Sequence, residues 1–110
     1  MSANCAAPFS DLLATAHHVG DVSGHVITPY FRRALKVDNK AAAGQFDPVT
    51  AADRAAERAI AKTLKATWPK HGIEGEEYGI RHGISPYRWV IDPIDGTRAF
   101  ILGLPLWGTL

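Results

Sequence analysis

The 110-residue sequence contains a single cysteine and no long apolar run. These two shortages argue against a disulfide-stabilised protein and against a membrane-spanning protein. Its single cysteine, Cys5, cannot form an internal disulfide, which fits a reducing compartment. No apolar run approaches the length of a membrane span, and the N-terminus lacks the basic start and apolar block of a secretory signal. We therefore expect a cytoplasmic protein with no membrane partner.

Charge of one sign is also scarce, because 12 basic and 11 acidic residues leave a net charge of +1. A nucleic-acid groove or a polybasic membrane patch needs a clear excess of Lys and Arg. We therefore expect no nucleic-acid partner. The composition that remains, 46% hydrophobic and 21% charged, is ordinary for a soluble globular protein, and the length suffices for one small domain.

The last eleven residues, 100–110, are unusually apolar for a chain terminus, since seven of them are large and apolar. A solvent-exposed segment of this kind promotes aggregation. We infer that its packing partners lie outside the chain. Residues 1–110 are therefore expected to be a fragment of a longer single domain.

Two segments show the apolar spacing of helices. The first covers residues 8–34, and Pro29 predicts a kink or break near residues 25–29. The second covers about residues 50–67 and begins at Thr50-Ala-Ala-Asp53, which has the form of a capping box. Its many alanines allow close packing against a neighbour.

The remaining segments read as short strands and turns. They are a strand and loop in 35–48, an extended piece Ile73–Glu76, a loop 79–86, a strand Tyr87–Ile91, a turn Asp92–Gly96, a helical turn Thr97–Leu102 and a strand Leu104–Leu110. Helices that come first and strands that come later predict an α+β fold rather than a parallel βαβ series.

The stretch Asp92-Pro-Ile-Asp95-Gly96-Thr97 holds two carboxylates three residues apart at the end of a predicted strand. Carboxylates ~4–5 Å apart repel by roughly 1 kcal/mol in water and several times more in a partly buried site, so the pair favours a cation. Oxygen ligands suit a hard cation such as Mg2+. Gly96 allows close backbone approach, and Thr97 can begin a helix whose N-terminus attracts an anion. The stretch therefore indicates phosphate chemistry.

Simpler roles exist for the same residues. Asp-Pro and Asp-Gly are common turn pairs, and Thr97 can be a plain N-cap. A capping box accounts fully for Asp53, and Glu76 and Glu77 can be a solvated pair before a loop. If Glu76 lies beside Asp92, it becomes a third carboxylate on the same cation. Residue by residue, these alternatives stay open.

Other phosphate and metal chemistries lack their signatures. An aspartyl-phosphate phosphatase needs two aspartates separated by one residue, whereas Asp92 and Asp95 are separated by two. The sequence contains no Walker-type Gly-Lys-Ser/Thr, and its five histidines show no zinc spacing.

Three motifs, taken together and in order, resemble the inositol monophosphatase family. They are Phe46-Asp-Pro-Val-Thr-Ala-Ala-Asp53-Arg-Ala-Ala-Glu57, Gly75-Glu76-Glu77 and Trp89-Val-Ile-Asp92-Pro-Ile-Asp95-Gly-Thr97. Within the family, two further stretches look most like the histidinol-phosphatase branch. These are His71-Gly-Ile-Glu-Gly-Glu-Glu-Tyr-Gly79 and Gly103-Leu-Pro-Leu-Trp-Gly-Thr-Leu110.

The resemblance implies the N-terminal part of a layered αβαβα sandwich of the sugar phosphatase type. It implies Mg2+-dependent hydrolysis of a small-molecule phosphate monoester, with L-histidinol phosphate of histidine biosynthesis as the first choice. Alternatives are inositol 1-phosphate, a nucleotide 3′-phosphate or a sugar phosphate. Another alternative is a truncated, non-catalytic chain that binds metal. The expected partners are a small-molecule phosphate ester and a second copy of the chain in a homodimer.

The resemblance also implies roles for individual residues. The implied Mg2+ ligands are Glu76, Asp92, Asp95 and the carbonyl of Ile94. The residues implied to orient and deprotonate the attacking water are Asp53, Glu76 and Thr97. Those implied to hold the substrate phosphate are Asp95, Gly96 and Thr97. A further family ligand, an aspartate from the C-terminal half, has no counterpart, so the implied activity belongs to the complete protein and not to these 110 residues alone.

Overall fold

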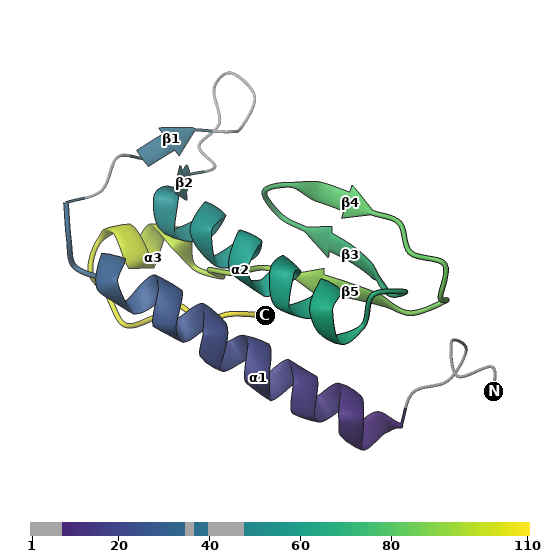
Figure 1. Cartoon of the computed structure of the whole chain (residues 1–110). Coiled ribbons are helices and arrows are strands. Elements are labelled where there is room, and N and C mark those ends of the chain that lie inside the picture. Colours follow the sequence, from purple (N-terminus) through teal and green to yellow (C-terminus); the bar gives the residue numbers. More distant parts are fainter. Residues whose placement is uncertain (1–7, 35–36, 40–47) are drawn as a thin grey trace.

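The computed structural model describes residues 8–34, 37–39 and 48–110 (Figure 1). The elements are α1 (Phe9–Ile27), the 3-10 helix η2 (Thr28–Tyr30), β1 (Val37–Asn39), β2 (Pro48–Thr50), α2 (Ala51–Thr67), β3 (Gly72–Gly75), β4 (Gly79–Arg81), β5 (Arg88–Ile91) and α3 (Thr97–Ile101). Helices combined with a mixed sheet make this an α+β fold, as the sequence predicts.

The main sheet has the strand order β4-β3-β5. Strands β3 and β5 are parallel, and their pairing runs from Gly72 opposite Arg88 to Gly75 opposite Ile91. Strands β3 and β4 form an antiparallel hairpin. The prediction of a loop over residues 79–86 is therefore wrong at its start. Gly79, at φ +76°, reverses the chain so that the three residues after the turn pair back onto β3.

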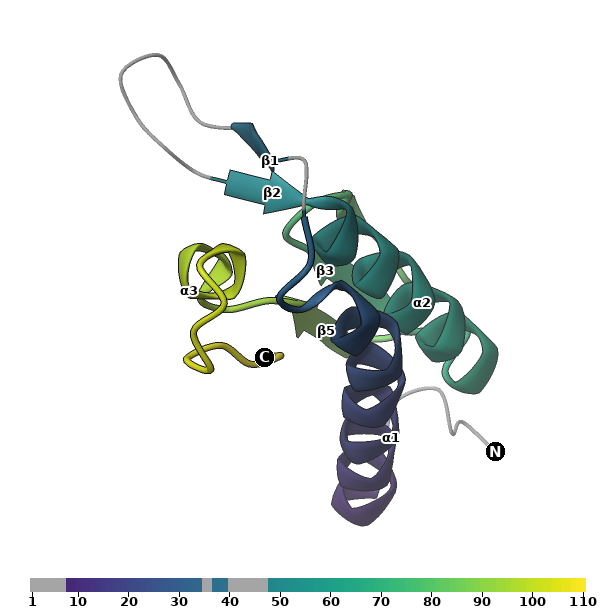
Figure 2. The same ribbon diagram turned by 90° about the vertical axis from the view of Figure 1, so that its left-hand side faces the viewer.

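Helices α1 and α2 lie side by side and form one layer against the sheet (Figures 1 and 2). The core between the layers contains five buried residues and two half-buried ones. They are Val19, Ile60, Leu64, Ile73 and Ile91, with Ala61 and Trp89 packed against them. One face of α2 is buried, with Ala52, Asp53, Ala56, Glu57, Ile60 and Leu64. Strand β1 pairs with β2 as a separate antiparallel ribbon that leads into α2.

The first helix breaks where the proline predicts. α1 ends at Ile27 and continues only as the short η2, which contains Pro29. The missing N–H of proline ends the α-helical hydrogen-bond ladder there. The predicted extension to residue 34 is wrong, because Arg32 has φ +59° and lies in a turn beyond both helices.

A second core joins α3 to the N-terminal end of α2. Its buried members are Ile27, Ala52, Ala56, Ile94 and Phe100, and its half-buried members are Val26, Tyr30, Phe31 and Trp107. The Phe100 ring lies 5.1 Å from that of Trp107, edge to face. Part of the apolar C-terminal run is thus packed, whereas Leu102, Leu106 and Leu110 are each more than 70% exposed.

Within the described ranges, the helices are too short or too polar to cross a membrane.

Candidate active site

The parallel register of β3 and β5 brings two of the predicted acidic residues to one edge of the sheet. Gly75 and Ile91 are opposite each other at the carboxyl ends of the two strands. Glu76 and Asp92 are the next residue on each strand, so their backbones leave the sheet side by side. Asp95, Gly96 and Thr97 follow directly after Asp92. Sequence segments that are 16 residues apart therefore meet where a sheet commonly presents its ligands.

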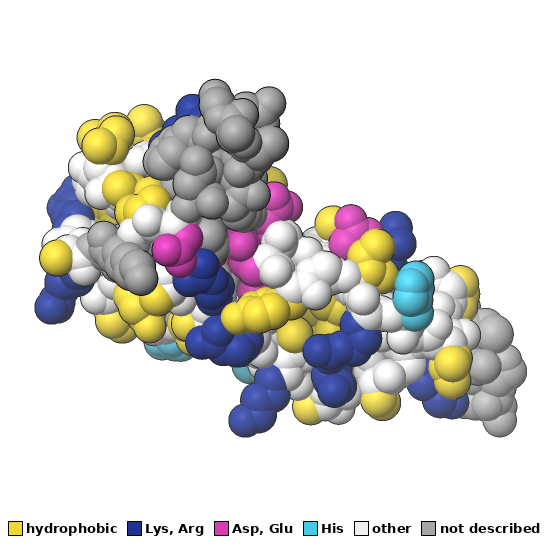
Figure 3. Space-filling view, turned by 90° about the horizontal axis from the view of Figure 1, so that it is seen from above, with side chains coloured by type: hydrophobic (Ala, Val, Ile, Leu, Met, Phe, Trp, Pro, Cys, Tyr) yellow, Lys and Arg dark blue, Asp and Glu magenta, His cyan; other side chains and the backbone are white. Residues whose placement is uncertain are grey.

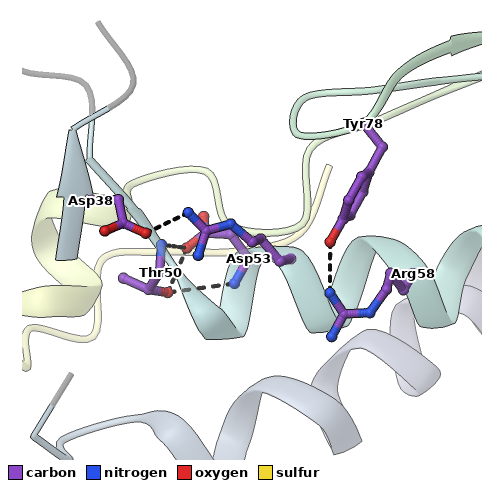
Figure 4. A network of polar contacts seen from close by, with 6 residues as sticks. Asp38, Thr50, Asp53, Arg58 and Tyr78 are labelled. Carbon is purple, nitrogen blue, oxygen red and sulfur yellow. Dashed lines mark hydrogen bonds and ion pairs between the residues drawn. The ribbon is translucent and has the colours of Figure 1, made fainter. Parts of the chain in front are cut away.

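Asp53 reaches the same region from the start of α2, where it completes the predicted capping box (Figure 4). Its Oδ2 accepts hydrogen bonds from the Thr50 backbone N–H at 2.9 Å and from Thr50 Oγ1 at 2.6 Å. The Asp53 N–H in turn donates to Thr50 Oγ1 at 3.4 Å. Asp53 is 2% exposed. The capping role that the sequence indicates is therefore real.

Capping occupies only one of the two carboxyl oxygens of Asp53. The other, Oδ1, accepts a hydrogen bond from Thr97 Oγ1 at 3.1 Å. The same hydroxyl lies 3.0 Å from the carbonyl oxygen of Ile94. Because a hydroxyl carries a single proton, Thr97 divides or alternates its donation between the two acceptors. Asp53 is thus both a helix cap and a contact of the Asp92–Thr97 segment.

A neighbouring ion pair fixes the entry to α2. Arg54 donates to Asp38 of β1 at 2.6 Å, and this hydrogen bond raises the pKa of the Arg54 guanidinium (Figure 4). The contact ties β1 to the turn of α2 that carries Asp53.

A backbone bulge shapes the segment between the two aspartates. Asp92 and Leu110 exchange both backbone hydrogen bonds, at 2.8 and 2.9 Å, and Asp95 and Gly108 do the same at 2.7 and 3.1 Å. Two residues, Pro93 and Ile94, therefore oppose the single Thr109, whose hydroxyl donates to the Pro93 carbonyl at 2.7 Å. Such a bulge bends the strand and redirects its side chains.

The predicted strand over Leu104–Leu110 is not formed as a regular element. Its residues pair with the opposite segment at Gly108 and Leu110, and the bulge at Pro93 and Ile94 interrupts the ladder between these two pairs.

Gly96 is required by both backbone conformation and space. It has φ +90° and ψ 40°, a left-handed conformation, at the position before α3. A Cβ at this position would lie 2.6 Å from the carbonyl oxygen of Leu106. The α3 helix then begins at Thr97, whose hydroxyl is held by Asp53 and Ile94 as described above. The first N–H groups of a helix have no acceptor within it, and in proteins such groups often bind anions.

The predicted ligands have the donor atoms that a hard cation prefers. Every predicted ligand atom is an oxygen, and the Ile94 carbonyl, which accepts from Thr97, has a second lone pair to offer. Glu76 and Asp95 are exposed and Asp92 is half-buried. Their side chains do not converge in this structure, since no three Asp, Glu, His or Cys side chains of the described ranges lie close enough together to hold a metal ion. The fold therefore places the predicted donor residues on adjoining segments of the chain.

Glu57 is a residue of this region to which the sequence analysis assigned no role. It is 2% exposed. Its Oε1 accepts from the Glu77 backbone N–H and its Oε2 from the Tyr78 backbone N–H, both at 2.7 Å. A sequence signal for it exists, because Asp53, Glu57, Ile60 and Leu64 form one helical stripe. A glutamate on that buried stripe needs fixed partners.

The histidines take no part in this arrangement. His71 is stacked on Trp68 with ring centroids 4.8 Å apart, and its Nδ1 accepts from Trp89 Nε1 at 2.9 Å. Burial lowers the pKa of the His71 imidazole. The other four, His17, His18, His25 and His82, are exposed.

A groove of about 770 Å³ lies between α2 and the β3–β4 hairpin, and Glu57 is one of its lining residues. Arg58, Lys62, Lys65 and Arg81 line it together with Ile73 and Ile80. Figure 3 shows the molecule from above, where Lys and Arg side chains flank apolar ones. None of the site residues predicted from the sequence lines this groove.

Comparison with known proteins shows which family the chain resembles. The model of the inositol monophosphatase family matches residues 9–110. The chain is 40% identical over 103 residues to a histidinol-phosphatase of Streptomyces coelicolor, covering 93% of this chain and 37% of that protein. It is 38% identical over 109 residues to an inositol monophosphatase of Mesembryanthemum crystallinum, covering 96% of this chain and 38% of that protein.

Among solved structures, the Thermotoga maritima IMPase superposes with a TM-score of 0.79 at 32% identity. The match covers 90% of this chain and 37% of that one. The chain thus spans little more than a third of the length of these relatives. It belongs to the inositol monophosphatase family.

Proposed function

We propose that the complete protein is a Mg2+-dependent phosphate monoester hydrolase and that residues 1–110 form its N-terminal part. Membership of the inositol monophosphatase family supports this, as do relatives named as histidinol-phosphatase and inositol monophosphatase. The observation that carries the proposal is the Thr97 hydroxyl, which bridges Asp53 and the Ile94 carbonyl beside the paired ends of β3 and β5.

The proposed ligands of the cation are Glu76, Asp92, Asp95 and the carbonyl of Ile94. When bound, Mg2+ would lower the pKa of the attacking water and neutralise charge on the leaving oxygen. The ordered backbone of Asp92 and Asp95, each paired with the C-terminal segment, holds these donors at a fixed spacing along the chain.

The chain's own groups handle the proton of the attacking water. The Thr97 hydroxyl donates to Asp53 Oδ1 or to the Ile94 carbonyl, and its oxygen can accept a hydrogen bond from a water. As Thr97 takes up the proton of that water, its own proton can pass to Asp53. Glu76, at the end of β3, supplies a second acceptor from the adjoining strand. A water held in this way presents its oxygen to a phosphorus atom, and positioning of this kind is a large part of the rate gain.

The substrate phosphate is proposed to lie against Asp95, Gly96 and Thr97. The left-handed Gly96 makes the turn that leads into α3, and the first N–H groups of a helix have no acceptor within it. Preorganised donors of this kind stabilise charge on the phosphoryl oxygens.

We propose L-histidinol phosphate as the substrate, because the segments 71–79 and 103–110 look most like the histidinol-phosphatase branch. Inositol 1-phosphate is the second candidate, favoured by the relatives of that name. Phosphate release by the complete protein should be measured on both substrates, with Mg2+ and with EDTA. Turnover of histidinol phosphate that EDTA abolishes is the expected result. A preference for inositol 1-phosphate would make that compound the assigned substrate instead of L-histidinol phosphate. Mg2+ binding without any phosphate release would indicate a non-catalytic metal-binding chain.

A further inference from the structure

We propose that Glu57 is a positioning residue that sets Glu76 in place for the cation. This inference rests on the proposed function. Glu57 lies on α2 and contacts neither Mg2+ nor substrate. Its two carboxyl oxygens hold the backbone N–H groups of Glu77 and Tyr78, the two residues that follow Glu76.

The contact is built into the interior rather than added at the surface. Glu57 is 2% exposed, and a carboxyl group is costly to bury unless its oxygens are hydrogen-bonded. Both oxygens have backbone donors at 2.7 Å. Because those donors are main-chain groups, Glu57 fixes the path of the turn itself and thereby the direction in which Glu76 leaves β3.

Gly75 makes this contact sterically possible from the other side. A Cβ on Gly75 would lie only 2.1 Å from Oε2 of Glu57 and 2.3 Å from its carboxyl carbon. No side chain fits between the end of β3 and the Glu57 carboxyl group. Each residue of the Gly75-Glu76-Glu77 motif thus has its own role. Gly75 leaves space for the Glu57 carboxyl group, Glu76 is the proposed cation ligand, and Glu77 donates its backbone N–H to Glu57.

The same helix supports both halves of the site. Asp53 and Glu57 are one turn apart on α2, and both are buried. Asp53 holds Thr97, and Glu57 holds the turn that begins at Glu76. A single rigid helix therefore sets the spacing between the segment that orients water and a segment that binds the cation.

A second tie between α2 and this turn offers a matched control. Arg58 Nη1 donates to the hydroxyl of Tyr78 at 2.6 Å, as Figure 4 shows, and this contact lies at the surface. Tyr78→Phe removes this surface contact and leaves the Tyr78 backbone N–H on Glu57. Ile60→Val, three residues beyond Glu57 on α2, controls for a small loss of core stability.

The test uses the complete protein in five forms: unchanged, Glu57→Gln, Gly75→Ala, Tyr78→Phe and Ile60→Val. Hydrogen–deuterium exchange reports the Glu77 and Tyr78 amides, and Mg2+ titration by calorimetry reports the dissociation constant. Glu57→Gln and Gly75→Ala act on one contact from opposite sides, so each should speed exchange of these amides and raise the Mg2+ Kd about tenfold. The two controls should leave both quantities within about twofold of the unchanged protein.

The outcomes separate the inference from the proposed function. Faster amide exchange with an unaltered Mg2+ Kd in both variants would overturn the positioning role and leave the proposed function standing. Failure of the unchanged protein to bind Mg2+ would overturn the proposed function, and the role of Glu57 with it. Should Glu57→Gln not fold, Gly75→Ala decides alone, because its backbone conformation is open to alanine and α2 keeps its own sequence.

Discussion

The hydroxyl of Thr97 lies 3.1 Å from Oδ1 of Asp53, although 44 residues separate the two in sequence. The opposite oxygen of the same carboxyl group caps α2 through Thr50. Asp53 therefore links the start of a helix to the candidate site, and its structural and chemical roles can be separated by substitution.

Asp53→Asn should keep most of the stability and lose most of the activity. The amide oxygen can still accept from Thr50, but the amide nitrogen then faces Thr97, which can no longer pass a proton in that direction. We expect a loss of about 1 kcal/mol in unfolding free energy and a fall in kcat of orders of magnitude. Urea unfolding and steady-state kinetics of the complete protein measure the two effects. Asp11→Asn, at an exposed position on α1, is the control, and intact turnover in Asp53→Asn would leave Asp53 only its capping role.

Asp95→Asn should weaken Mg2+ binding and turnover together with little effect on folding. Asp95 is exposed, and its backbone hydrogen bonds to Gly108 are kept by asparagine. The substitution removes one negative charge from the proposed ligand set. The Mg2+ affinity measured by calorimetry and the rate of phosphate release should both fall by orders of magnitude. The urea midpoint should stay near that of the unchanged protein. Near-normal rates at low Mg2+ would end the assignment of Asp95 as a ligand.

Gly96→Ala should destabilise the fold, whereas the same substitution at Gly20 should not. At Gly96 the new methyl group would meet the Leu106 carbonyl at 2.6 Å, in a left-handed backbone conformation that alanine adopts at a cost. We expect a loss of about 1–3 kcal/mol in unfolding free energy. At Gly20, within α1, a Cβ would meet nothing within 4 Å beyond its own stretch of helix, so alanine there should add up to about 1 kcal/mol. Equal urea midpoints for the two variants would contradict the conformational argument.

Stability should fall as the pH is lowered through the titration of His71. Burial lowers the pKa of folded His71 from its ordinary value of 6.5, so the unfolded chain binds the proton first. The contribution of His71 is complete above pH 6.5, and it is lost as the pH falls from 6.5 towards the lowered pKa of the folded state. Urea unfolding between about pH 5 and 8 should show a slope that His71→Gln reduces. The exposed His17→Gln should keep that slope, and an unchanged slope in His71→Gln would refute the assignment.

Elements whose signals are local could be predicted from the sequence. The capping box at Thr50 and Asp53 marks the start of α2 to within one residue, because both partners lie within one turn of the chain. The break of α1 follows from Pro29, which acts on its own helix. The strand β5 likewise follows from a short apolar run.

The errors arose where pairing with a distant segment decides the structure. Residues 79–81 became a strand because β3 offers them a partner, whereas their own sequence reads as a loop. Residues 104–110 have the composition of a strand but face a bulge at Pro93 and Ile94, which breaks the ladder. Most of the predicted strand and loop over 35–48 lies outside the described residues.

By itself, the sequence determined the helical stripe of α2, the caps and turns, and the kinds of oxygen donor available for a cation. Only the tertiary structure decided that Glu76 and Asp92 end neighbouring parallel strands, that Thr97 meets Asp53, and that Glu57 holds the turn after Glu76. The physical reason is that periodicity and capping act over one or two turns of chain. Strand register and the burial of a carboxyl group depend on which surfaces the two cores bring together.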